Sequence, residues 1–84
     1  MSGRLRIDFQ PEEGAVIRMI GLIERRGFQV RGLGMTEEGG SASLVVDLEP
    51  RDPARSLATL DLQIRRLHGV QAVSIFTPAA GAVS

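Results

Sequence analysis

The stretch from Gly14 to Met35 constrains the fold of this chain more than any other. Its first half shows the period of an amphipathic helix, with apolar residues at three- and four-residue steps. These residues are Val16, Met19, Ile20 and Ile23. Gly27 suits a helix C-terminus, and a strand-like segment from Phe28 to Met35 follows it at once. Such a tight passage from helix to strand is typical of a β-α-β-β-α-β unit.

Three more segments have the patterns of strands. Arg4–Phe9 and Ser41–Glu49 alternate apolar and polar residues with a period of two, which predicts half-buried strands. We expect Val70–Phe76 to form the fourth strand. Residues 36–40, Thr-Glu-Glu-Gly-Gly, tolerate positive φ and predict a hairpin between the second and third strands.

A second helix is predicted between the third and fourth strands. Its apolar stripe has spacings of three, four and three, formed by Leu57, Leu60, Ile64 and Leu67. We expect Asp52 to be its N-cap and Pro53 to occupy its first position. Gly69 is expected to stop it.

The predicted fold class is therefore α+β, a ferredoxin-like βαββαβ sandwich. A four-stranded antiparallel sheet would pack two helices on one face. We expect one domain over residues 4–76 and a flexible C-terminal tail over residues 77–84, which are small and include Pro and Gly. An open sheet leaves exposed edges, so we expect a homodimer through a sheet edge.

Composition excludes most site chemistry. The chain has no cysteine, which removes thiol catalysis and thiolate metal sites, and a single histidine cannot form a multi-histidine metal site. Ten acidic residues balance ten basic ones, and the predicted third strand has no aromatic residue, so nucleic-acid binding is not expected. No apolar run approaches the roughly 18 residues of a membrane helix. We expect a cytoplasmic protein with no catalytic residues, no metal and no cofactor.

The remaining polar groups have ordinary structural explanations. His68 is expected to be a cation or cap at a helix terminus, with a general base as the alternative. Glu12 and Glu13 are expected to stabilise a helix start, with paired carboxylates as the alternative. Arg25 and Arg26 are expected to be a solvated helix end, with contact to an acidic partner surface as the alternative. The glycines at 32 and 34 lack the spacing of a phosphate-binding loop.

A run of residues from Gly14 to Leu33 resembles the small regulatory subunit of acetolactate (acetohydroxyacid) synthase, an ACT-domain family. The pattern is G-[AV]-[LV]-x-R-[VM]-x-G-L-[FI]-x-x-R-G-[FY]-x-[IV]-x-x-[LM]. Its positions are filled by Gly14, Ala15, Val16, Arg18, Met19, Gly21, Leu22, Ile23, Arg26, Gly27, Phe28, Val30 and Leu33. The second helix is similar as well, with Gln63, Arg66, Leu67, Val70 and Val73. The short chain looks most like the single-domain version of this subunit.

The resemblance implies a non-catalytic partner of the large, thiamine-diphosphate-dependent catalytic subunit, in branched-chain amino acid biosynthesis. It also implies a side-by-side dimer that binds valine, leucine or isoleucine at the loop between the first strand and first helix. Mapped onto this sequence, the candidate ligand-binding residues are Gln10, Glu13, Gly14, Ala15, Val16, Gln29, Leu33 and Met35. A glycine at a helix N-terminus offers free N–H donors to a carboxylate, and Val16, Leu33 and Met35 are expected to line an apolar pocket.

Two positions depart from the pattern of effector-binding members. Pro11 and Gln29 stand where those members carry asparagine, and Glu13 lies where a carboxylate would approach. We therefore expect an activating subunit with weak or absent valine feedback. The alternatives are a stand-alone homodimeric ACT domain that senses a small amino acid, an interaction module without a ligand, and a small enzyme.

Overall fold

Four strands and two helices follow one another along residues 3–76, the part of the chain that this computed structural model describes. The elements are β1 (Gly3–Phe9), α1 (Ala15–Arg25), β2 (Phe28–Glu38), β3 (Ser41–Pro50), α2 (Leu57–Arg65) and β4 (Val70–Phe76). The predicted order β-α-β-β-α-β is confirmed. The predicted tail, residues 77–84, lies outside the described residues.

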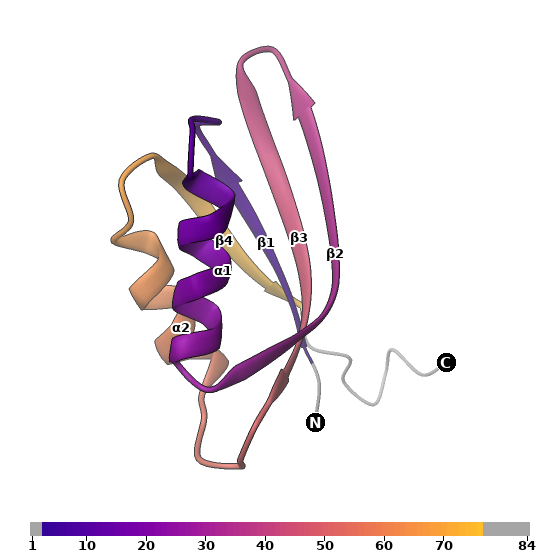
Figure 1. Ribbon diagram of the computed structural model, residues 1–84, viewed down its shortest axis with the longest axis vertical. Helices are drawn as coiled ribbons and strands as arrows, with labels where there is room; N and C mark the ends of the chain where they lie inside the picture. The colour runs from indigo at the N-terminus through magenta and orange to yellow at the C-terminus, as the bar shows by residue number, and fades with distance from the viewer. Residues whose placement is uncertain (1–2, 77–84) are drawn as a thin grey trace.

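The strands form one antiparallel sheet in the order β2-β3-β1-β4. Both helices cover the same face of this sheet, as Figure 1 shows. The first and third strands are therefore central, and β2 and β4 form the two edges. This arrangement is the ferredoxin-like sandwich that the residue pattern predicts.

The core lies between the helices and the central strands. Alternate residues of β1 and β3 are almost fully buried and face the helices: Leu5, Ile7, Phe9, Ala42, Leu44, Val46 and Leu48. Helix α1 contributes Met19 and Ile23, and α2 contributes Leu60 and Ile64. The period of two in the strands and of 3.6 in the helices places these side chains on one face of each element.

The start of α2 differs from the prediction. Ser56, not Asp52, is the N-cap, and its hydroxyl accepts a hydrogen bond from the backbone N–H of Thr59 at 3.3 Å. Asp52 instead accepts from the N–H of Ala54 at 2.9 Å and closes a separate turn that contains Pro53. Aspartate and serine both satisfy free N–H groups in turns and at helix starts, so the local pattern allowed either choice.

The β2–β3 hairpin is longer than expected. Strand β2 continues to Glu38, and the connection shrinks to Gly39 and Gly40, whose φ values are 60° and 86°. Two consecutive residues with positive φ fit a tight two-residue turn whose twist matches the flanking strands. As a result Thr36, Glu37 and Glu38 belong to the strand, and the hairpin extends past the N-terminal end of α1 (Figure 1).

Helix α1 has 11 residues and α2 has 9. Neither of these helices in the described residues is long and apolar enough to cross a membrane.

Two isoleucines of α1 test the packing of the helix on the sheet. Ile23 is fully buried, whereas Ile17 is 78% exposed. Ile23→Ala should lower the free energy of unfolding by about 2 to 5 kcal/mol, because it leaves a cavity in the core. Ile17→Ala should change it by no more than about 0.5 kcal/mol. Urea unfolding followed by circular dichroism measures both, and equal losses would contradict the described orientation of α1.

Candidate functional site

The loop between β1 and α1 is built around Gly14. Gly14 is the N-cap of α1 and has φ 81°, a left-handed conformation that favours glycine. The N–H of Ala15 bonds to the carbonyl of Glu12 at 3.0 Å, and the N–H of Arg18 bonds to the carbonyl of Gly14 at 3.0 Å. The N–H groups of Val16 and Ile17 lie in the first turn, where a helix provides no backbone acceptor. These two N–H groups are therefore the backbone donors with which this loop could bind a ligand.

The loop is held from one side by the turn between α2 and β4. The N–H of Gln10 donates to the carbonyl of Gly69 at 2.8 Å, and the side-chain amide of Gln71 donates to Oε1 of Gln10 at 3.0 Å. Gln10 therefore positions the loop, and its side-chain oxygen is already engaged.

Glu12 lies between the side chains of Arg18 and His68 at the same place. Its carboxylate oxygens are 3.7 Å from Nη2 of Arg18 and 3.8 Å from Nε2 of His68. Both contacts are exposed and long, so each contributes little to stability. The carboxylate nevertheless neutralises the arginine nearest to the helix N-terminus. A ligand carboxylate would have to compete with Glu12 for Arg18.

One flank of α1 is apolar and faces away from α2. Arg26 on the α2 side donates a hydrogen bond to Oε1 of Gln63 at 3.0 Å, and Arg18 also lies on that side, beside Leu67 and His68. With 3.6 residues per turn, Val16 and Ile20 lie on the other flank, toward the β2 side of the sheet. Both are half-buried and pack against the core.

Leu33 and Met35 lie on the same side of the sheet. They pair with Val46 and Leu44, two fully buried residues of β3 that face the helices. Yet Leu33 is 54% exposed and Met35 is 43% exposed, because no helix covers this part of the edge strand. Val16, Ile20, Leu33 and Met35 thus form an apolar strip, partly open to solvent, between α1 and the free edge of β2.

The predicted site residues are only partly brought together. Gly14, Ala15 and Val16 begin α1, and Leu33 and Met35 lie on the helix-facing side of β2. Gln29 pairs with Glu49, so it lies on the opposite face of the sheet, at the end of β2 near the C-terminus of α1. Within one chain Gln29 is separate from the loop. Ala15 is buried and serves the core, while Glu13 is exposed.

The sequence patterns missed Ile20 and the Gln10–Gln71 contact. The helix period predicts only that Ile20 is an ordinary core residue. The contact between Gln10 and Gln71 joins residues 61 positions apart. The only available signal was the position of Ile20 one turn after Val16 on the same flank.

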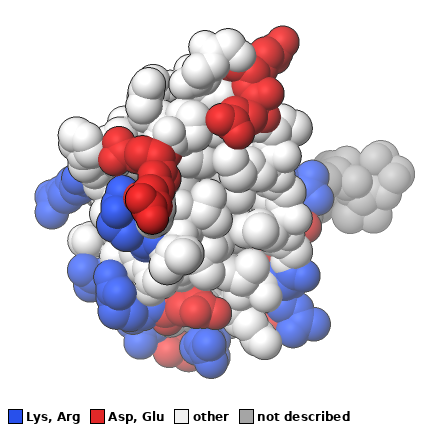
Figure 2. All heavy atoms as spheres, turned by 45° about the horizontal axis from the view of Figure 1, so that its top comes forward, with Lys and Arg blue, Asp and Glu red and all other residues white. Residues whose placement is uncertain are grey.

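Acidic side chains dominate the end of the molecule that carries this loop. Figure 2, in which the top of Figure 1 comes forward, shows them in separate groups. The acidic residues on the loop and the hairpin tip are Glu12, Glu13, Glu37 and Glu38, all exposed. This charge opposes an anionic ligand and favours a group that carries an ammonium.

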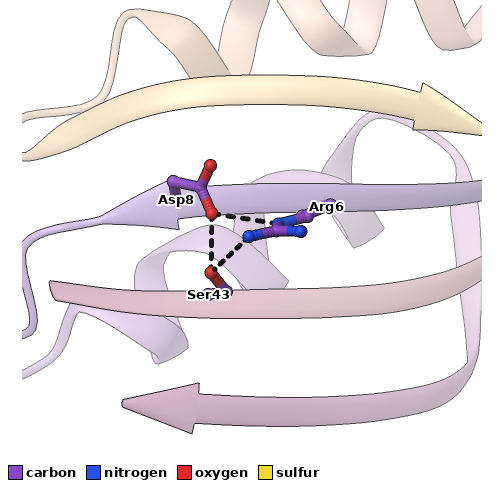
Figure 3. Close-up of polar contacts among 3 residues, drawn as sticks. All are labelled: Arg6, Asp8 and Ser43. Atoms are coloured by element: carbon purple, nitrogen blue, oxygen red, sulfur yellow. Dashed lines mark hydrogen bonds and ion pairs between the residues drawn. The ribbon is translucent and has the colours of Figure 1, made fainter. Parts of the chain in front are cut away.

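A second polar cluster lies on the sheet face without helices. Figure 3 shows the hydroxyl of Ser43 donating to Oδ1 of Asp8 at 2.6 Å, with the guanidinium of Arg6 beside both. The hydrogen bond from Ser43 is the main cause that lowers the pKa of Asp8 below its ordinary value, and Arg6 adds to it. The three groups satisfy one another, and the described residues contain no group of three or more potential metal ligands around them or elsewhere. The cluster is structural.

Comparisons with known proteins agree with this geometry. A family model described as "ACT domain" matches residues 11–73. The ACT domain from GTP pyrophosphokinase of Chlorobium tepidum is 18% identical, with a TM-score of 0.75 over 90% of this chain and 97% of that one. An ACT domain protein from Streptococcus pneumoniae is 15% identical, with a TM-score of 0.77 over 94% and 91%.

A formyltetrahydrofolate deformylase from Pseudomonas putida KT2440 is similar over 93% of this chain but only 29% of its own length. Its identity is 13% and its TM-score 0.77. No curated protein sequence matches the chain significantly. The solved structures share the fold at low identity, and the family model covers the loop and both helices.

The hydrogen bond from Ser43 to Asp8 can be tested by titration. Ser43→Ala should raise the pKa of Asp8 toward its ordinary value, because the largest favourable contact of the carboxylate is lost. In the wild type, the folded pKa lies below the unfolded one. The contribution of Asp8 to stability is therefore present above the unfolded pKa of about 4 and is lost as the pH falls through the folded pKa.

Carboxyl NMR titration measures this pKa directly. Ser41→Ala, on the same strand, is the control and should leave Asp8 unchanged. An unshifted Asp8 in Ser43→Ala would contradict the assigned cause.

Proposed function

We propose that this chain, which belongs to the ACT domain family, is a non-catalytic regulatory subunit of acetolactate synthase. The family itself gives the coarser function, a regulatory domain of a kind that commonly binds small ligands. The proposal adds the partner: a separate catalytic subunit that holds thiamine diphosphate and is activated by this chain. We take residues 4–76 as the ACT domain and the cytoplasm as its location.

The support for this partner is the residue pattern from Gly14 to Leu33. It combines the left-handed glycine before α1, the Arg-Gly pair that ends the helix and the aromatic residue that opens β2. Each of these positions has a structural task in the fold. Their joint spacing is what resembles the small subunit of acetolactate synthase.

The geometry of the loop supports an effector site for a branched-chain amino acid. The N–H groups of Val16 and Ile17 at the start of α1 suit a carboxylate, and a helix N-terminus adds a favourable dipole. The apolar strip from Val16 to Met35 suits a branched aliphatic side chain. This pairing of a donor-bearing loop with an exposed apolar strip is the observation that carries the effector site.

One chain supplies only half of such a site. Leu33 and Met35 are open to solvent, and the hollow beside the loop, lined by Phe9, Arg18 and His68 among others, is shallow. A second copy placed against the free edge of β2 would cover the strip. We therefore propose that the effector binds between two copies, in a homodimer formed through a sheet edge.

The charges near the loop support weak feedback. Glu12 and Glu13 are exposed beside the donors, and Pro11 offers neither an amide side chain nor an N–H. The acidic residues would attract the ammonium of an amino acid but oppose its carboxylate. We propose an activating subunit whose response to valine is weak or absent.

Reconstitution tests the regulatory function. Added to a purified acetolactate synthase catalytic subunit from the same source, the chain should form a complex in size-exclusion chromatography and raise its turnover. A chain that neither binds nor activates that subunit would overturn the assignment. Saturable binding of an amino acid in that case would instead favour a stand-alone ACT sensor.

Calorimetric titration with valine, leucine and isoleucine tests the effector loop. Where binding is measurable, Gly14→Asp should abolish it, because it adds a negative charge and a side chain at φ 81°. Gly40→Asp is the matched control: its φ is 86°, but it lies in the hairpin turn with open space around it. Equal affinities in the two variants would overturn the assigned loop.

A further inference from the structure

The end of the molecule opposite the acidic loop carries a group of arginines. Helix α1 ends and α2 begins at this end, whereas the Gly14 loop and the hairpin tip lie at the other (Figure 1). Arg26 follows α1 directly, and Arg51 and Arg55 belong to the connection between β3 and α2. All three arginines are exposed. We call these three residues the arginine cluster.

Gly27 is the point at which the three segments of the arginine cluster meet. It follows Arg26 in the chain and has φ 91°. Its carbonyl accepts a hydrogen bond from the backbone N–H of Arg51 at 2.8 Å. A Cβ added to Gly27 would meet Cδ of Arg55 at 2.9 Å, so this side chain lies directly against the glycine. The fold therefore gathers three arginines from separate segments around one residue.

A hollow of about 170 Å³ opens between the end of α1 and the start of α2. We call it the α1–α2 hollow. Two guanidinium groups, two hydroxyls and one side-chain amide line it, and they belong to Arg26, Arg55, Ser56, Thr59 and Gln63. The nearly buried side chains of Phe28 and Leu60 also line it, and no acidic residue does. The α1–α2 hollow is therefore suited to a negatively charged group.

The positive charge of the arginine cluster is only partly neutralised. Oδ2 of Asp52 lies 3.3 Å from Nε of Arg55, so this carboxylate pairs with one of the three arginines. Arg26 donates a hydrogen bond to Oε1 of Gln63 at 3.0 Å, which is an uncharged acceptor. Within residues 3–76, neither Arg26 nor Arg51 is in an ion pair. One carboxylate against three guanidinium groups leaves the cluster positively charged.

We propose that the arginine cluster docks on an acidic segment of the catalytic subunit, with one carboxylate of that segment in the α1–α2 hollow. The inference rests on the proposed function and specifies the surface by which this chain binds its partner. Guanidinium groups present paired N–H donors that match the geometry of a carboxylate. The hydroxyls of Ser56 and Thr59 lie beside them as additional donors. Opposite charges on the two surfaces also speed their association.

The exposure of the α1–α2 hollow favours a protein surface over a free anion. Pairs between exposed guanidinium groups and anions contribute little in water, so free phosphate should bind only above roughly 10 mM. A partner surface that covers the hollow excludes water from the same pairs and strengthens their attraction. The acidic end of a second copy carries complementary charge as well, and the experiment has to separate these occupants.

The experiment measures the affinity of charge-reversed variants for the purified catalytic subunit. Arg26→Glu and Arg51→Glu should each raise the Kd about tenfold or more, because a like charge then faces the acidic segment. Arg66→Glu is the matched control: it makes the same charge change at the other end of α2 and should leave the Kd unchanged. Arg26→Lys keeps the charge and should retain most of the affinity. Circular dichroism checks that every variant is folded.

The outcomes separate this surface from the proposed function. Equal affinities of Arg26→Glu, Arg51→Glu and Arg66→Glu would overturn the docking surface, and activation by the wild type would still support a regulatory subunit. A wild-type chain that does not bind the catalytic subunit would overturn both. Added salt should raise the Kd of the wild type more steeply than that of Arg26→Glu, since more charge pairs are screened. Equal salt dependence would contradict the proposed pairs.

Two measurements on the isolated chain test the other occupants. In an NMR titration with inorganic phosphate, the amide signals of Ser56 and Thr59 should reach half-saturation only above about 10 mM. Tighter binding would make the α1–α2 hollow a site for a small anion and overturn the docking surface. Sedimentation should show the same self-association for Arg26→Glu and the wild type. Weaker self-association of the variant would assign the arginine cluster to a contact between copies.

Discussion

The packing of helix α1 on the sheet buries Met19 and Ile23 in one core with the helix-facing residues of β1 and β3. Eleven helical residues span about 16 Å, whereas the eleven residues of β2 span about 36 Å. The helix starts where β1 ends and stops where β2 begins. It can therefore cover the central strands but not the outer half of the hairpin.

This difference in length explains why the functional features gather at one end. Past Leu33, strand β2 has no helix above it, and its apolar side chains stay exposed although their β3 partners are buried. The N-terminus of α1 and the Gly14 loop lie at that same end. A donor-bearing loop and an uncovered apolar edge thus lie on the same part of the surface, and burying that edge favours association with a second chain.

The electrostatics of this end restrict what it can bind. Glu12 and Glu13 lie beside the backbone donors, and the hairpin tip adds Glu37 and Glu38. The net charge of the chain is zero, so this acidic end is balanced by arginines elsewhere. A regulatory domain with this arrangement suits association with charged partner surfaces better than tight capture of a carboxylate.

Most of the fold could be predicted from the residue pattern, but two boundaries could not. The helix and strand periods are strong local signals, because they reflect which face of each element is apolar. Asp52 and Ser56 are both good caps, and only the turn formed by residues 52–55 decides between them. The glycines at 39 and 40 predicted a hairpin, but the extension of β2 to Glu38 depends on its pairing with β3.

The candidate site was predictable to a similar degree. Gly14 was identified because glycine before a helix marks a special backbone conformation, and the structure gives it φ 81°. Gln29 was grouped with the loop, yet its pairing with Glu49 places it on the opposite face. The contact between Gln10 and Gln71 joins distant parts of the chain, and no local pattern encodes it.

The order of the elements and the apolar face of each were encoded in local periodicity, since burial selects side chains at fixed spacings along a helix or strand. Which apolar side chains remain exposed was decided by the tertiary structure alone. Leu33 and Leu44 have the same apolar chemistry and face the same side of the sheet, but one is half exposed and the other fully buried. The difference arises because β3 lies between two strands beneath the helices, whereas Leu33 lies in the outer half of the edge strand β2, which no helix covers.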